Sequence, residues 1–182
     1  MTDADLAARV ATFAAAAALS TTQDVVRLTL PSLGAGAQPD VVAEETLSLV
    51  ATVTARAAEA GLQTRPEALA AAGAALLELP FLYHDFLLGA DLVASGAEGD
   101  VEPDVSVYER LARKGEFYGV HLPPGRVPGP SLLREKLPLW MGRVSPPRLP
   151  TSPDRRLGDL GVAELLGAHV RLVLAFAQKA AG

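Results

Sequence analysis

The chain has 182 residues, no cysteine and a formal net charge of −5 at pH 7, and these facts narrow what it can be. The length suffices for one domain with a substantial core, and the lack of cysteine excludes disulfide bonds, a thiol nucleophile and thiolate metal ligands. The charges are unevenly distributed, because residues 113–156 hold nine Arg and Lys against three Asp and Glu, whereas the rest of the chain holds seven against eighteen. We therefore expect an acidic body that carries one basic segment.

Two apolar runs have some features of targeting or membrane segments. The run ATFAAAAAL at 11–19 follows Asp3 and Asp5, whereas a secretory signal needs positive charge at that place. The most apolar later run, at 160–177, contains acidic, basic and imidazole side chains that are costly in a bilayer. We therefore expect a cytoplasmic protein with no membrane partner.

The first half of the chain predicts a series of helices. Asp3 can cap a helix from about residue 4 to residue 19. Residues 26–30 alternate strictly between apolar and polar side chains, so the stretch 22–30 fits either a short helix, which we favour, or a strand. Residues 39–61 have separate apolar and polar helical faces and end at a glycine that we interpret as a left-handed stop. The capping-box pattern at 64–67 then predicts a further helix that is rich in small residues.

Proline and glycine mark the boundaries of the next predicted helices. Pro80 cannot donate a hydrogen bond to the carbonyl of Leu76, so a kink or break is expected there, before a helix over 81–95. Asp104 can cap a helix that we expect to end at Gly115. The residues that follow, 116–122, are left open as a possible strand.

The last third of the chain combines a proline-rich segment with a final helix. Residues 123–153 contain nine of the fourteen prolines, interrupted by one short predicted helix at 131–142. Apolar residues at helical spacing predict a last helix over 159–179. The whole pattern predicts an all-α, single-domain bundle of six or seven helices over 1–182, with a long irregular segment before the last helix. We expect this segment, 116–157, to form an extended Pro/Arg-rich arm within the domain.

His84 and Asp85 stand side by side in FLYHDFLLGAD and raise the question of a catalytic or metal site. His169 projects from the apolar face of the last helix, where a neutral imidazole needs a buried hydrogen-bond partner. If the two helices touch, these three side chains could form the site of a small enzyme or ligand-binding protein. The two histidines with Asp91 and His121 could also bind a metal ion. No ligand pair at helical spacing supports a metal, so we expect no cofactor and favour ordinary core or surface histidines.

Sequence motifs of known chemistry are not present. There is no GxSxG nucleophile turn, and the glycines lack the spacing of phosphate-binding or dinucleotide-binding loops. Residues 55–73 have the helix, Gly turn and second helix of a helix-turn-helix, but the second helix offers only Arg65 toward DNA. We therefore favour an ordinary helical hairpin, assign no catalytic residue and do not favour nucleic acid as a partner.

The basic arm has two interpretations. In the first, which we favour, the arm wraps the acidic body, its cations pair with carboxylates, and Trp140 fills a gap. In the second, the arm presents its cations to an anionic partner, with Trp140 as the anchor. The partner-binding residues would then be Arg126, Trp140, Arg143, Arg148, Arg155 and Arg156.

The leading functional hypothesis from the sequence is a non-enzymatic scaffold or regulatory protein that self-associates as a homo-oligomer. Its arm would contact a protein or another anionic macromolecule. The first alternative is a helical-bundle enzyme or ligand-binding or metal-binding protein, with a site that uses His84, Asp85 and His169. The second alternative is a nucleic-acid-binding protein that uses the basic arm.

Overall fold

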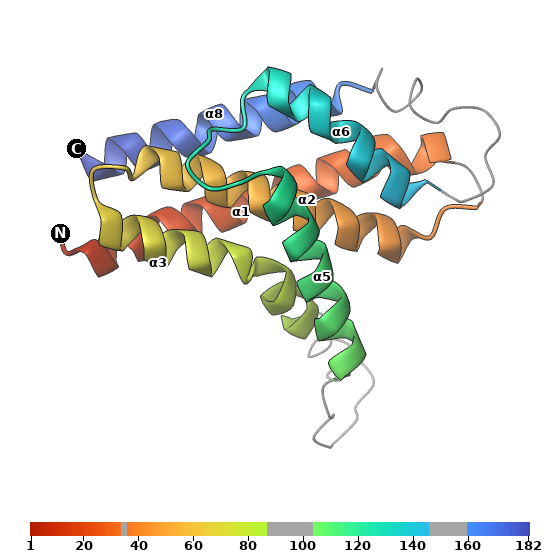
Figure 1. Ribbon diagram of the computed structural model, residues 1–182, viewed down its shortest axis with the longest axis horizontal. Coiled ribbons are helices and arrows are strands. Elements are labelled where there is room, and N and C mark those ends of the chain that lie inside the picture. The colour runs from red at the N-terminus through yellow and green to blue at the C-terminus, as the bar shows by residue number, and fades with distance from the viewer. Residues whose placement is uncertain (34–35, 87–103, 146–159) are drawn as a thin grey trace.

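The computed structural model describes residues 1–33, 36–86, 104–145 and 160–182 of the chain. These residues form an all-α bundle in which no strand occurs (Figure 1). The helices are α1 (Asp3–Leu33), α2 (Pro39–Gly61), α3 (Pro66–Leu77), α5 (Val105–His121), α6 (Pro130–Val144) and α8 (Val162–Ala181). Residues 79–86 are also helical, and we call this stretch helix 79–86. The predicted fold class is therefore confirmed.

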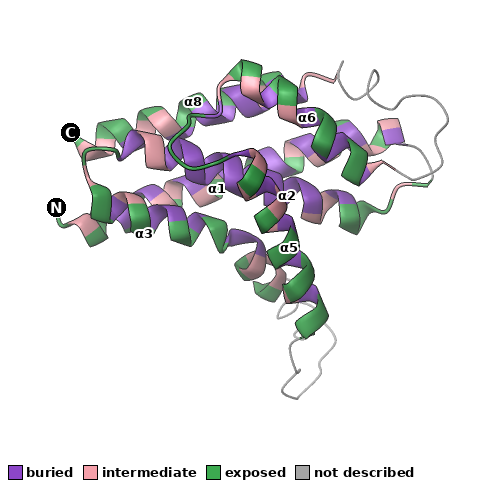
Figure 2. Cartoon of the chain, viewed as in Figure 1, coloured by how far each residue is buried: buried purple, intermediate pink, exposed green. Residues whose placement is uncertain are grey.

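Helix α2 lies at the centre of the bundle. It packs against α1, α3, α5, α6 and α8, and residues 45–58 are all buried (Figure 2). Several of these residues carry hydroxyl groups, which donate to carbonyls one turn earlier in the same helix, as Thr52 does to Ser48 at 2.9 Å. Because the hydroxyls are satisfied within the helix, α2 can bury every face. Among the described helices, none has both the length and the hydrophobicity that crossing a membrane requires.

Helix α1 is longer than the sequence predicted. Residues 22–30 are helical, as we favoured, but they continue the first helix without a break at residue 19. Their alternating pattern hides a helical one, because Thr22, Val25 and Thr29 fall on one buried face. The hydroxyl of Thr29 donates to the Val25 carbonyl at 2.6 Å, which satisfies a polar group on this face.

The caps of α1 and α3 differ from those predicted. Thr2, not Asp3, caps α1, since its hydroxyl accepts from the Asp5 amide at 3.1 Å and the Thr2 amide donates to the Asp5 carboxylate at 3.1 Å. Asp3 instead accepts from the guanidinium of Arg65. Arg65 is also the residue before α3, where no side chain caps the helix, so the predicted capping box at 64–67 is wrong. This pair joins the starts of α1 and α3.

Gly61 is the last residue of α2, but it is not the left-handed stop that the sequence predicted. It does not have the positive φ of a left-handed stop. A Cβ atom at this position would lie 2.5 Å from the Cβ of Ala177 and 3.0 Å from the carbonyl oxygen of Leu174. Gly61 therefore allows α2 and α8 to approach each other more closely than any other residue would permit.

Helix α5 begins as predicted and ends later. The carboxylate of Asp104 accepts from the Ser106 amide at 2.9 Å, which caps the helix. The helix then continues past Gly115 to His121, so the possible strand at 116–122 is not formed. Continuation buries Tyr118 against the centre of the bundle, and this packing outweighs the low helix propensity of glycine.

The Pro/Arg-rich segment is not an extended arm where the structure describes it. Residues 116–121 belong to α5, and 130–144 form α6, which packs against α2 and α8. Trp140 of α6 has 0% exposure, and its indole N–H donates to the hydroxyl of Thr46 at 3.3 Å. Residues 146–159 lie outside the described part of the chain. The residues of the segment that belong to α5 and α6 are thus regular structure inside the fold, and apolar side chains from both helices lie in the core.

Candidate functional site

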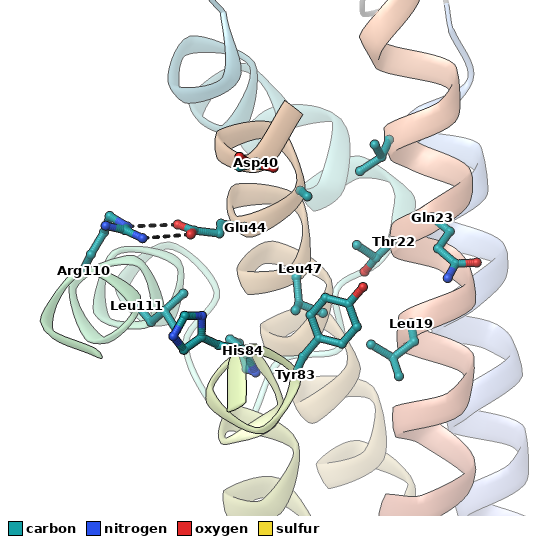
Figure 3. Close-up of a pocket in the computed structure, with 13 residues that line it drawn as sticks. Leu19, Thr22, Gln23, Asp40, Glu44, Leu47, Tyr83, His84, Arg110 and Leu111 are labelled. Atoms are coloured by element: carbon teal, nitrogen blue, oxygen red, sulfur yellow. Dashed lines mark hydrogen bonds and ion pairs between the residues drawn. The ribbon is translucent and has the colours of Figure 1, made fainter. Parts of the chain in front are cut away.

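A cleft of about 640 Å³ opens between α1, α2, helix 79–86 and α5 (Figure 3). Its size falls in the range of pockets that hold small organic molecules. Each of the four elements contributes side chains to its wall. They are Leu19, Thr22, Gln23 and Val26 of α1, Asp40, Ala43, Glu44 and Leu47 of α2, Pro80, Tyr83 and His84 of helix 79–86, and Arg110 and Leu111 of α5.

The inner part of the cleft is apolar. Leu47 of α2 and Leu111 of α5 are buried, and Leu19 and Val26 of α1 are half-buried beside the opening. Ala43 of α2 also lines the cleft, and its small side chain occupies little of the space. When a ligand covers an apolar surface that is open to solvent, the free energy of binding becomes more favourable by about 25 cal/mol per Å² of surface covered.

Polar groups lie around this apolar surface. Thr22 and Gln23 come from α1, and Tyr83 and His84 come from helix 79–86. Tyr83 points toward Thr22 and Leu19, whereas His84 points the other way, toward Leu111 of α5 (Figure 3). Tyr83 and His84, although adjacent in the sequence, therefore lie on opposite sides of the cleft.

Tyr108 of α5 fixes helix 79–86 in place. Its ring stacks on Phe81, with centroids 6.1 Å apart, and meets the edge of His84 at 5.8 Å. Its hydroxyl donates to the carboxylate of Asp85, and this bond raises the pKa of Tyr108 above its ordinary value. These three contacts hold the short helix against α5, and they orient the adjacent Tyr83 and His84 toward the cleft.

The charged rim of the cleft is already paired within the chain. The guanidinium of Arg110 donates to both carboxylate oxygens of Glu44, at 3.0 and 2.9 Å, and the ammonium of Lys114 donates to Glu44 at 3.0 Å. Partial burial acts to raise the pKa of Glu44, but these bonds outweigh it and hold the pKa below its ordinary value. Asp40 lies at the exposed mouth, in the first turn of α2.

A second charged cluster lies behind the rim and joins three helices. Glu45 of α2 is only 3% exposed and accepts from Arg143 of α6 at 2.7 and 2.9 Å and from the Tyr118 hydroxyl at 2.9 Å. Lys114 lies 3.2 Å from the same carboxylate. Burial acts to raise the pKa of Glu45, but these donors hold it below its ordinary value, while burial and the carboxylate raise that of Tyr118. The guanidinium of Arg143 also covers the ring of Phe117 at 4.5 Å.

His169 is a satisfied core histidine. Its Nδ1 atom lies 3.0 Å from the Thr21 hydroxyl of α1, and its Nε2 atom lies 2.6 Å from the Thr54 hydroxyl of α2. Since the Thr54 hydroxyl donates to the Val50 carbonyl at 2.6 Å, it must accept from Nε2, and the Thr21 hydroxyl then donates to Nδ1. Burial lowers the pKa of His169 from 6.5 to about 4, so the ring is neutral near pH 7.

The structure separates the histidines that the sequence suggested could converge. His84 lines the cleft, His121 packs on Phe117 at 4.7 Å, and His169 lies between Thr21 and Thr54. Asp85 binds Tyr108, and Asp91 lies outside the described residues. Within the ranges that the structure describes, no group of three His, Asp or Glu side chains is placed to hold a metal ion.

The proposed partner-binding residues are divided in the same way. Trp140 is buried against α2, Arg143 is paired with Glu45 of α2 but keeps part of its side chain exposed, and Arg126 is exposed in the connection between α5 and α6. Arg148, Arg155 and Arg156 lie outside the described part, so their role in binding a partner stays a prediction. The sequence reasoning did not identify Tyr83, Glu44 or Arg110 as site residues. The one signal for Tyr83 was its position next to His84.

Comparisons with models of known protein families, with curated proteins and with solved structures found no match.

Proposed function

We propose that this protein binds a small, largely apolar molecule in the cleft between α1, α2, helix 79–86 and α5. The observation that supports this most is the combination of an open apolar floor with hydrogen-bonding side chains from opposite walls, as Thr22 and Tyr83 provide. Binding sites for small molecules typically have this composition, in which apolar contact supplies affinity and a few polar groups supply orientation.

Binding accounts for the cleft without a catalytic step. A nucleophile would need a base within hydrogen-bond distance. Among the described residues of the cleft, the hydrogen bonds join Glu44 to Arg110 and Lys114, and the Thr22 hydroxyl to the Ala18 carbonyl. None of these bonds activates a nucleophile, and Asp85 is turned toward Tyr108 rather than toward His84.

The experiment is a titration with Nile red, a neutral dye whose fluorescence rises in apolar surroundings. Ala43→Phe adds a ring to the lining of the cleft without removing a core side chain, and we expect it to weaken dye binding at least tenfold. Ala175→Phe adds the same ring at an exposed position of α8 and serves as the control. Far-UV circular dichroism should show that both variants keep the helical content of the parent chain.

The two variants separate binding in the cleft from binding elsewhere. Loss of dye binding in Ala43→Phe alone supports the proposal. Equal dye affinity in the parent chain and in both variants would show that the dye binds outside the cleft, and a parent chain that does not bind the dye would also reject the proposal.

A further inference from the structure

We infer that the ligand of this cleft is uncharged, and that the pairing of Glu44 with Arg110 sets this selectivity. The inference rests on the proposed function and adds the chemical class of the ligand. The class is a neutral molecule with an aromatic or aliphatic frame and one group, such as an alcohol or an amide, that can form hydrogen bonds. The argument begins with what the charged side chains of the rim already bind.

The strongest charges in the wall of the cleft bind each other. Arg110 and Glu44 form two parallel N–H to oxygen bonds at 3.0 and 2.9 Å, which is the geometry in which guanidinium and carboxylate groups interact most strongly. Lys114, whose side chain is 5% exposed, donates to the same carboxylate at 3.0 Å and is itself shared with Glu45. Each charged side chain of this group therefore already has a partner of opposite charge within the chain.

A charged ligand would have to compete with this arrangement. A carboxylate that took the bidentate position on Arg110 would displace Glu44 and leave it with Lys114 alone, and one that bonded to the remaining N–H groups of Arg110 would lie beside the negative charge of Glu44. An ammonium group that approached Glu44 would meet the positive charges of Arg110 and Lys114. In both cases the ligand also gives up its hydration when it enters an apolar cleft, which is costly for an ion.

Asp40 does not change this balance. It lies at the exposed N-terminal turn of α2, where solvent and ions screen its field within about 10 Å at ordinary salt concentration. It can draw cations toward the mouth, but the apolar floor between Leu47 and Leu111 lies beyond it.

The hydrogen-bonding groups that remain for a ligand are neutral. The Thr22 hydroxyl donates to the Ala18 carbonyl at 2.8 Å, so its oxygen is left to accept a hydrogen bond from a ligand. The Tyr83 hydroxyl, which points toward Thr22 in Figure 3, can donate or accept, and so can the amide of Gln23. An alcohol or an amide can bond to these groups as donor and acceptor at once.

Three probes with one frame and different charge test the inference. They are 2-naphthalenemethanol, which is neutral, 2-naphthoate, which is anionic, and 2-naphthylmethylammonium, which is cationic. Isothermal titration calorimetry at pH 8, where free imidazoles are neutral, gives their affinities for the parent chain. We expect the neutral probe to bind at least tenfold more tightly than either ion, and Ala43→Phe to weaken its binding.

Variants of the charged pair give a sharper test, because they should change the selectivity in opposite directions. Glu44→Gln leaves Arg110 without its carboxylate and should improve binding of 2-naphthoate, relative to the neutral probe, at least fivefold. Arg110→Gln leaves Glu44 with Lys114 alone and should improve the ammonium probe, by a smaller factor. The double variant removes both charges and should restore the preference for the neutral probe. Asp24→Asn removes a carboxylate of α1 outside the cleft and is the control.

The outcomes distinguish this inference from the proposed function. If Nile red binds in the cleft but an ion binds the parent chain as tightly as 2-naphthalenemethanol, the ligand class is wrong and the binding function stands. A selectivity change in Glu44→Gln no larger than that in Asp24→Asn would show that the pair does not set the selectivity. If neither Nile red nor any probe binds, the proposed function and this inference fall together.

Discussion

His169 should make the stability of this protein depend on pH in the mildly acidic range. The ring is 3% exposed, and its neutral form is bonded at both nitrogens, to Thr21 and to Thr54. Protonation would require the Thr21 hydroxyl to turn away and would place a charge in the core. Because the folded-state pKa, about 4, lies below the unfolded value of 6.5, the unfolded chain binds the proton first as the pH falls.

The magnitude follows from the two pKa values. The contribution of His169 is fully present above pH 6.5 and is lost as the pH falls toward 4. At 1.36 kcal/mol for each unit of pKa difference, the loss is about 2 kcal/mol by pH 5 and about 3 kcal/mol by pH 4. A loss of this size is a large part of the free energy of unfolding of an ordinary domain, about 5–15 kcal/mol.

The assay is urea denaturation, followed by circular dichroism, at several pH values between 7 and 5. Glu44 and Glu45 also lower stability as the pH falls, because their pKa values are depressed in the folded state, so the parent chain alone does not isolate the histidine. His169→Gln keeps the carboxylates and cannot titrate. The parent chain should lose about 2 kcal/mol more than this variant between pH 7 and 5. Parallel curves for the two proteins would refute the reasoning.

Three further predictions concern packing and buried charge. Gly61→Ala should lower the free energy of unfolding by about 1–3 kcal/mol, because its methyl group would overlap α8. Gly119→Ala, at a helical position with open space around it, should raise the free energy of unfolding by about 0.5–1 kcal/mol, and urea denaturation of both variants checks the contrast. Trp140→Ala should cost about 3–5 kcal/mol through the cavity it leaves, as measured by the urea midpoint and slope, and a cost below about 1 kcal/mol would contradict its core position. Glu45→Ala should cost about 1–3 kcal/mol, because it leaves the buried Lys114 with Glu44 alone and removes the acceptor of Arg143 and Tyr118, while Asp24→Ala, which breaks an exposed pair, should cost less than about 1 kcal/mol in the same assay.

Local patterns in the sequence predicted the helices and their approximate order. Helix α2 was the clearest, because Pro39 and Gly61 bound a long stretch with one strongly apolar face. The ends of α1 and α5 were less predictable. Both helices continue past the residue where the local pattern predicted an end, because their next turns are buried. Tyr118 of α5 bonds to Glu45 of α2, and Val25 and Leu33 of α1 are buried in the core. These contacts join distant parts of the chain, and a local pattern does not contain that information.

The cleft could not be predicted in this way because its walls come from distant parts of the chain. Glu44 and Arg110 are 66 positions apart, and nothing near either residue indicates that they meet. The excess of cations after residue 112 did indicate that basic and acidic parts would pair, as Arg143 and Glu45 do. It did not indicate that the short helix predicted at 131–142 would pack against α2 and α8 in the core, because the many prolines around it suggested an extended arm.

The central position of α2 has a consequence for how the protein folds and unfolds. A helix with residues 45–58 buried on every side has no stable surface of its own until α1, α3, α5, α6 and α8 surround it. Its neighbours in turn bury their apolar faces against it, so none of them can detach without uncovering this helix. The whole domain should therefore unfold in one cooperative transition. A shortened chain that lacks α8 would expose a threonine- and alanine-rich surface of α2 that water does not solvate well.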